Sequence, residues 1–219
     1  MQDVGSAVIA AAGLGSRIGL GMPKCMIEID GVTILTRLLN AIRPHVSTIH
    51  LVVGYREDMV IEYCSVHHRD VVLVRNPDYR STNTAYSFAK GAEHLKGKVV
   101  YIDGDLLIDP ASLTGFFEAA KQEDILVGVT DAKSENAVYV ESATAGDSIA
   151  ITGFTREIRG QFEWANIVSG PNDLLLGASG YVYERLEEHL PLQGCALKLA
   201  EVDTAEDLNA AIKFARQGG

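Results

Sequence analysis

Residues 7–24 of the chain read AVIAAAGLGSRIGLGMPK, and the other motifs can be interpreted outward from this stretch. Its apolar first part is typical of a buried β-strand, which runs into a glycine-rich turn. Glycines allow backbone N–H groups to converge on an anion, and Arg17 and Lys24 add full positive charges behind the turn. The stretch therefore predicts a phosphate-binding loop at the end of the first strand.

Two common phosphate-binding motifs do not fit this turn. A dinucleotide-binding fingerprint has glycines at relative positions one, three and six; Gly13 and Gly15 fit, but Ile18 stands at the sixth position. A P-loop requires Gly-Lys followed by Ser or Thr, which is absent near the turn. Two alternatives stay open, namely another kind of phosphate loop and an ordinary tight turn between strand and helix.

Length and composition indicate a globular domain that handles small molecules. The 219 residues suffice for one domain with a well-filled core, and we expect residues 1–219 to form it. The formal net charge of 19 − 29 = −10 argues against a nucleic acid as partner and favours a mononucleotide. No apolar run approaches the roughly 20 residues that span a bilayer, and the N-terminus lacks a secretion signal. We expect a cytoplasmic protein without a membrane partner.

The three cysteines give no sign of a structural framework. They are odd in number and far apart in the sequence, at Cys25, Cys64 and Cys195. Such spacing argues against both a disulfide framework and a clustered zinc site.

The first 130 or so residues alternate apolar runs with amphipathic stretches, which is typical of a parallel sheet covered by helices. The predicted strands are residues 8–12, 49–53, 71–74, 99–102 and 125–129. Helices are predicted between them, one beginning at Pro110 and one ending before Pro44.

The pattern changes from about residue 133. Residues 137–141 and 148–152 suggest shorter strands, whereas residues 156–173 look irregular and polar. A long irregular stretch in a compact domain is often a binding loop, so a ligand-binding insertion is predicted around residues 133–180. A helix from Tyr183, a strand over 198–202 and a helix over 206–216 complete the chain.

Carboxylates stand at two positions where a metal could bind. Asp103-Gly104-Asp105 follows a buried strand, and open α/β sheets bind ligands at such strand ends. Mg²⁺ commonly takes one or two protein carboxylates and completes its shell with phosphate oxygens, although two acids can also simply end a strand in solvent. Asp203 is a second candidate opposite Asp105, but by itself Asp203-Thr204 is better explained as the cap of the final helix.

A polar segment, Asn76-Pro77-x-Tyr79-x-x-Thr82-Asn83-Thr84 with Ser87 one turn later, follows the third strand. Its hydroxyl and amide groups could recognise the edge of a base. Helix capping and core packing explain the same residues equally well.

Taken together, these motifs resemble the nucleotidyltransferases that activate sugar phosphates and phospho-alcohols. The resemblance lies in Ala11 to Arg17 with Pro23-Lys24, in Asp105, and in residues 201–208; the segment from Asn76 to Asn83 looks most like the phosphocholine and phosphonate cytidylyltransferases. It implies a Rossmann-like, GT-A-like three-layer α/β/α fold with a mostly parallel central sheet.

The resemblance also implies the reaction and the roles of individual residues. CMP would be transferred from CTP to a small phosphonate or phospho-alcohol such as 2-hydroxyethylphosphonate, 2-aminoethylphosphonate or phosphocholine, with release of pyrophosphate. Lys24, Arg17 and Asp105 would be catalytic, and Asp105 with Asp203 would hold Mg²⁺. The nucleotide-binding residues would be Ala10, Ala12, Gly13, Leu14, Gly15, Ser16, Arg17, Lys24, Thr82, Asn83 and Ser87.

The acceptor is expected to meet residues of the irregular stretch. Arg156 and Arg159 are candidates to contact its anionic group, and Glu163 and Trp164 could face an amine or ammonium group. Solvated surface explains the two arginines equally well, and core packing explains Trp164 equally well.

Several other functions remain open. Another nucleotide with a sugar 1-phosphate or molybdopterin as acceptor is the nearest alternative, and Asp103-Gly104-Asp105 also matches the Asp-x-Asp motif of glycosyltransferases. A module that binds a nucleotide without turnover is a third. We further expect small molecules as partners, and the alternative that another enzyme of the same pathway is fused to or associated with this chain stays open.

Overall fold

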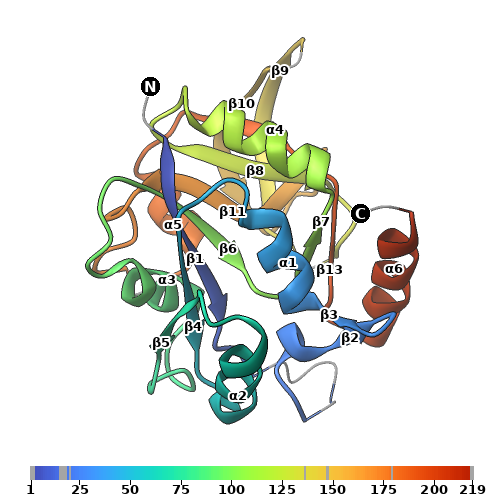
Figure 1. The fold of residues 1–219 in the computed structure, drawn as a ribbon. Helices are drawn as coiled ribbons and strands as arrows, with labels where there is room; N and C mark the ends of the chain where they lie inside the picture. The colour runs from blue at the N-terminus through green and yellow to red at the C-terminus, as the bar shows by residue number, and fades with distance from the viewer. Residues whose placement is uncertain are drawn as a thin grey trace.

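A nine-stranded sheet forms the centre of the protein in the computed structural model, which describes residues 3–14, 19, 21–135, 137–146, 148–178 and 180–217 (Figure 1). The strands follow one another across the sheet in the order β5 (Val72–Arg75), β4 (Thr48–Val53), β1 (Val4–Ala11), β6 (Lys98–Asp103), β11 (Phe162–Pro171), β8 (Leu126–Asp131), β12 (Leu192–Ala196), β10 (Ser148–Thr155) and β9 (Tyr139–Ala145).

Strands β5, β4, β1 and β6 are parallel to one another, and β8 and β12 are parallel to each other. The predicted α/β class with a mostly parallel core is therefore confirmed. The whole sheet is mixed, because β11 runs antiparallel to both β6 and β8.

Strand β11 corrects one prediction. Residues 156–173 were expected to be irregular, but Phe162–Pro171 forms a ten-residue strand in the middle of the sheet. Its ladder with β8 is interrupted between Trp164 and Val168, and this break disturbs the regular alternation by which a strand is recognised in a sequence. Strand β12 lies in a segment where no strand was predicted.

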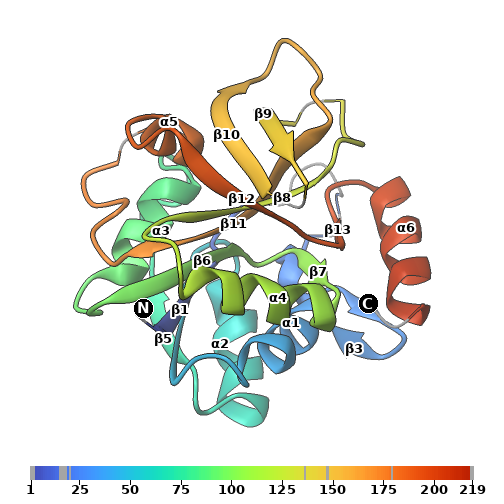
Figure 2. The same cartoon turned by 90° about the horizontal axis from the view of Figure 1, so that it is seen from above.

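Helices cover both faces of the sheet. Helices α1 (Ile34–Ile42), α2 (Glu57–His67) and α4 (Pro110–Ala120) share a hydrophobic cluster with one face, and α3 (Thr84–Ala92) and α5 (Val182–Glu187) share a cluster with the other. The hairpin of β9 and β10 projects from the sheet (Figures 1 and 2). The layers agree with the predicted α/β/α arrangement.

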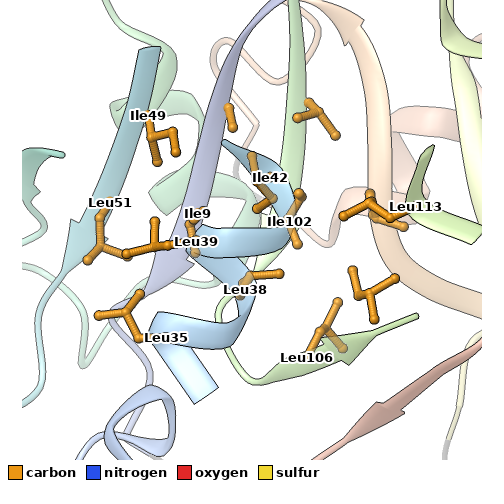
Figure 3. Packing of buried hydrophobic residues seen from close by; sticks show 14 of the residues in the cluster. Ile9, Leu35, Leu38, Leu39, Ile42, Ile49, Leu51, Ile102, Leu106 and Leu113 are labelled. Atoms are coloured by element: carbon orange, nitrogen blue, oxygen red, sulfur yellow. The ribbon is translucent and has the colours of Figure 1, made fainter. Parts of the chain in front are cut away.

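Helix α1 illustrates how the sequence produces this packing. The side chain of Thr33 accepts a hydrogen bond from the N–H of Thr36 and caps the helix. The apolar residues behind the cap recur at helical spacing, so they share one buried face. Figure 3 shows that face packed against strand residues of the same cluster, among them Ile9, Leu51 and Ile102.

A small unit at one flank carries the C-terminal part of the site. It contains η1 (Lys24–Met26), β2 (Glu28–Ile29), β3 (Val32–Thr33), β7 (Leu106–Ile108), β13 (Leu199–Glu201) and α6 (Ala205–Arg216). Strand β13 pairs with β7 so that Glu201 lies opposite Leu106, and α6 lies beside β13 and β3 (Figure 2). This pairing brings residues 201–203 next to Asp105. Among the helices of the described residues, none is long and apolar enough to cross a bilayer.

Close approach between α3 and the sheet depends on Gly91. A Cβ at this position would lie 2.4 Å from Cγ1 of Val8 and 2.6 Å from Cγ2 of Val52, both buried strand residues. Because α3 also carries residues of the polar segment, this contact fixes where that segment stands relative to the end of β1.

We predict that Gly91→Ala lowers the free energy of unfolding by about 1–3 kcal/mol, since the added methyl group overpacks the core. Gly115→Ala is the matched control: Gly115 is an exposed residue of α4 with no atom within 4 Å of an added Cβ. It should raise the free energy of unfolding by up to about 1 kcal/mol because alanine is the better helix former. Urea unfolding of both variants tests this, and an equal effect of the two substitutions would contradict it.

Candidate active site

A cleft of about 430 Å³ opens at the carboxyl ends of β1 and β6. Eighteen residues line it: Ala10, Ala11, Ala12, Gly13, Leu14, Lys24, Cys25, Tyr79, Arg80, Thr82, Asn83, Thr84, Ser87, Asp103, Gly104, Asp105, Glu201 and Asp203. All predicted nucleotide and metal residues within the described part of the chain are among them. The predicted Gly15, Ser16 and Arg17 lie outside the described residues.

Lys24 joins the N-terminal loop to the acidic side of the cleft. Its Nζ lies 2.7 Å from Oδ2 of Asp105 and also donates a hydrogen bond to Oδ1 of Asp203. Burial opposes the charged form, but the two carboxylates outweigh it and raise the pKa of Lys24. Lys24 is therefore a fixed positive charge of this site.

Three carboxylates gather around this ammonium group. One oxygen each of Asp105, Glu201 and Asp203 lies within 4.8 Å of the other two. Two local contacts bring them together: the β7–β13 pairing places Glu201 beside Leu106, and the N–H of Val202 donates to the carbonyl of Asp105 at 3.3 Å.

The acidic groups shift one another's titration. Burial, followed by the charges of Asp105 and Asp203, raises the pKa of Glu201 to about 8. Burial, followed by the charges of Asp105 and Glu201, raises the pKa of Asp103 well above its usual value. The carboxyl groups therefore oppose one another's ionisation, and the single positive charge of Lys24 does not fully offset this.

The donor set fits a hard divalent cation such as Mg²⁺. The three residues offer carboxylate oxygens, which Mg²⁺ prefers. The Oδ1 atom of Asp105 is buried and has no hydrogen-bond partner among the described residues. A cation would supply the interaction that this oxygen lacks.

Asp203 precedes the capping residue of the last helix and does not itself cap it. Thr204 caps α6, because its side chain accepts from the N–H of Asp207 while the Asp207 carboxylate accepts from Thr204. Capping therefore does not explain Asp203, whose carboxylate contacts Lys24 instead.

The other wall of the cleft, which also carries Arg80, presents a hydrogen-bonded set of neutral amide and hydroxyl groups. Asn76 is buried, and its Nδ2 donates to Oγ1 of Thr82 at 3.1 Å and to Oγ of Ser87 at 3.0 Å. The Thr82 hydroxyl in turn donates a hydrogen bond to the carbonyl of Asp78. Asn83 caps α3 by accepting from the N–H of Tyr86, and its Nδ2 donates to the carbonyl of Gly180.

The four predicted acceptor residues do not line this cleft. The guanidinium of Arg156 lies over the Tyr181 ring at 4.4 Å, and Arg159 donates to the carbonyl of Ala132 at 2.5 Å. Trp164 packs against the apolar cluster of the α3 face, and its Nε1 is buried without a hydrogen-bond partner among the described residues.

Glu163 holds a neighbouring loop in place. It is buried, and Oε2 accepts from the N–H groups of Lys133 and Ser134 at 3.1 and 3.0 Å. Its Oε1 accepts from the Ser134 hydroxyl at 3.1 Å. These contacts explain why a carboxylate stands within a buried strand.

Other residues of the site were given no role by the sequence. Glu201 and Tyr79 stand inside the two quoted motifs, and Arg80 follows directly, so the motifs themselves were the available signal. Asn166 donates to Oε2 of Glu201 at 3.0 Å from within β11. No local pattern marks it, because its neighbour is 35 positions away in the sequence.

Relatives of known name match parts of the chain. The CMP-5'-(3-aminopropyl)phosphonate synthase of Streptomyces rubellomurinus is 34% identical over 113 residues, which cover 49% of this chain and 18% of that protein. The bifunctional protein GlmU of Neisseria meningitidis serogroup A is 34% identical over 126 residues, which cover 56% of this chain and 26% of that protein. The chain thus spans about a quarter or less of the length of these relatives.

Solved structures share the fold over the whole chain. The inositol-1-phosphate CTP transferase from T. maritima superposes with a TM-score of 0.76 at 19% identity, covering 100% of this chain and 99% of that chain. At this identity the likeness concerns the fold.

The family follows from a match over most of the chain. The family model described as the MobA-like NTP transferase domain matches residues 7–166, which include the glycine-rich turn, the polar segment and Asp105. The nucleotidyltransferase resemblance of the motifs is therefore confirmed, and the chain belongs to the MobA-like NTP transferase domain family.

Proposed function

We propose that this protein is a Mg²⁺-dependent cytidylyltransferase that transfers CMP from CTP to a small phosphonate or phospho-alcohol and releases pyrophosphate. The observation that carries the proposal is a single cleft with two unlike walls. One wall holds Lys24 among carboxylates, and the other presents neutral hydroxyl and amide groups. A relative named as a CMP-phosphonate synthase supports cytidine and a phosphonate as the reactants.

The neutral wall supplies the base contacts in this proposal. Ser87 Oγ accepts a hydrogen bond from Asn76, so its own proton can be donated to an acceptor atom on the edge of cytosine. The Thr82 hydroxyl already donates its hydrogen bond to the carbonyl of Asp78, so its oxygen remains an acceptor for the exocyclic amine. The network thus prepares one donor and one acceptor before the nucleotide enters.

The charged wall acts on the triphosphate. Asp105 and Asp203, with Glu201 beside them, would hold Mg²⁺, which when bound neutralises charge on the phosphate oxygens. Lys24 brings a second positive charge to the same place and stabilises the charge that develops at the α-phosphate. The backbone of Gly13 and the predicted Arg17 contribute further phosphate contacts.

The reaction needs no covalent intermediate with the enzyme. An oxygen of the acceptor's phosphonate or phosphate group forms a bond to the α-phosphorus of CTP. The bond from that phosphorus to the bridging oxygen of the β-phosphate breaks, and pyrophosphate leaves with the electron pair. The chain's contribution is the alignment of the two reactants and the stabilisation of charge.

The acceptor contacts belong to the segment around residues 133–180 in this proposal. Arg156 and Arg159 carry the positive charge suited to the acceptor's anionic group. Stacking of Arg156 on Tyr181 orients its guanidinium. Glu163 and Trp164 are left out of the proposed acceptor contacts, because the Glu163 oxygens accept from the loop at Lys133 and Ser134 and Trp164 packs in an apolar cluster.

The reaction is tested by measuring pyrophosphate release from CTP, UTP, GTP and ATP with a panel of acceptors. The panel contains 2-hydroxyethylphosphonate, 2-aminoethylphosphonate, phosphocholine and a sugar 1-phosphate. We expect Mg²⁺-dependent release with CTP and at least one of the first three. Absence of release from every pair that contains CTP would refute the proposal, and release only with the sugar 1-phosphate would favour the sugar nucleotide alternative.

We predict that Asp105→Asn lowers kcat at least about 100-fold, because it removes charge that binds the metal and orients Lys24. Asp131→Asn is the matched control, since Asp131 is an exposed aspartate at the end of β8 and does not line the cleft. Steady-state pyrophosphate assays on both variants provide the comparison. Near-normal turnover of Asp105→Asn would exclude Asp105 from the metal site.

We predict that Ser87→Ala lowers kcat/KM for CTP about tenfold, which corresponds to the loss of one hydrogen bond of about 1–1.5 kcal/mol. Ser81→Ala is the control, because the exposed Ser81 bonds only the Asp78 carbonyl within the same loop. The kinetic assay is repeated with the next best nucleotide. An equal loss with both nucleotides would show that Ser87 does not recognise the base.

A further inference from the structure

Strand β11 contains a β-bulge next to the carboxylates of the cleft. In its ladder with β8, Trp164 pairs with Val129 and Val168 pairs with Val127, so three residues of β11 face only Gly128. A Cβ on Gly128 would lie 2.3 Å from Cγ2 of Ile167, which means that β8 provides a glycine where the bulge presses against it. Bulges of this kind frequently redirect a side chain next to an active site.

The redirected side chain is that of Asn166. Its φ of 54° is in the left-handed region, which asparagine tolerates better than most other L-residues. A glycine would adopt this conformation at less cost, so the backbone alone does not call for asparagine. The amide group has a contact of its own, in which Nδ2 donates to Oε2 of Glu201 at 3.0 Å.

The sheet register places this residue at the metal-binding end of the cleft. The β11–β6 ladder ends at the pair Ile167 and Ile102, which are the sequence neighbours of Asn166 and Asp103 respectively. The same bulge therefore lies beside the Asp103-Gly104-Asp105 turn. Glu201 approaches from β13 on the opposite side and meets the amide there.

We propose that Asn166 is a positioning residue that holds the Glu201 carboxylate toward Asp105 and Asp203 and thereby increases the affinity of the site for a divalent cation. The proposal rests on the proposed function through the metal site. A neutral amide suits this role, since it orients a carboxylate without cancelling the charge that binds the metal. The hydrogen bond engages one oxygen of the Glu201 carboxylate, Oε2.

Asn166→Gly distinguishes the effect of the side chain from the effect of the backbone conformation. Glycine keeps the left-handed conformation and removes only the amide, whereas Asn166→Ala removes the amide and also strains the backbone. Mn²⁺ alone serves as the probe, titrated into each protein and followed by its electron paramagnetic resonance signal. We expect Asn166→Gly to weaken Mn²⁺ binding about 10–100-fold, the usual effect of removing a partner of a metal ligand.

His94→Gly is the matched control. His94 also has a positive φ, of 72°, and is exposed in a turn away from the cleft lining. It should leave the Mn²⁺ affinity unchanged. Thermal unfolding of all variants is recorded alongside, and Asn166→Gly should lower the midpoint less than Asn166→Ala does.

A double-mutant cycle with Glu201→Ala tests whether Asn166 acts through Glu201. In the Glu201→Ala background, Asn166→Gly should cause no further loss of Mn²⁺ affinity, since the group that it positions is gone. An unchanged Mn²⁺ affinity of Asn166→Gly would overturn the proposal. The full single-variant loss appearing again in the Glu201→Ala background would also overturn it, as would absence of Mn²⁺ binding by the unmodified protein.

The Mn²⁺ experiment is independent of the reaction. If the unmodified protein releases no pyrophosphate from CTP but Asn166→Gly still weakens Mn²⁺ binding, the positioning role stands and the cytidylyltransferase proposal fails. If turnover is found and Mn²⁺ affinity is unchanged in Asn166→Gly, only the positioning role fails. If the positioning role and the cytidylyltransferase activity are both found, Asn166→Gly should lower kcat more than it raises KM for CTP.

Discussion

The concentration of carboxylates at one end of the sheet is the constraint on which the site depends. Asp105, Glu201 and Asp203 bring oxygens within 4.8 Å of one another, and such groups repel unless cations lie between them. Lys24 meets two of them and so ties the N-terminal loop to the C-terminal flank across 179 positions of sequence. In the proposed nucleotidyl transfer a divalent cation would meet the same carboxylates, and together with Lys24 it would be matched to a triphosphate.

The two walls of the cleft obtain their order from different sources. On the charged wall the order comes from strand pairing, since β7 with β13 sets Glu201 beside the end of β6. On the neutral wall it comes from Asn76, whose buried amide donates hydrogen bonds to the hydroxyl oxygens of Thr82 and Ser87 and so orients both hydroxyl groups. Gly91 lets α3 lie close against β1 and β4 and so sets the position of this wall relative to the end of β1.

Local patterns were enough to predict the parallel half of the sheet and much of the cleft. Apolar runs separated by capped helices identified β1, β4, β6 and β8, because those strands are largely buried on both faces. The apolar run of β5 was also recognised, although it is an edge strand whose residues are exposed or half-buried. Strand β11 was missed for the opposite reason: its bulge and its polar residues conceal the alternation of a strand. The interpretation of Glu163 as an acceptor contact rested on its polarity, whereas its oxygens accept from the loop at Lys133 and Ser134.

The sequence by itself determined the family, the order of the first strands and helices, and many of the residues that line the cleft, because these follow from short motifs and from periodic burial. Only the tertiary structure decided which side chains from distant parts of the sequence meet. Lys24 with Asp203, and Asn166 with Glu201, are pairs separated by 179 and 35 positions and joined by sheet register and a bulge. Register depends on how whole strands pack and pair, so no local pattern contains it.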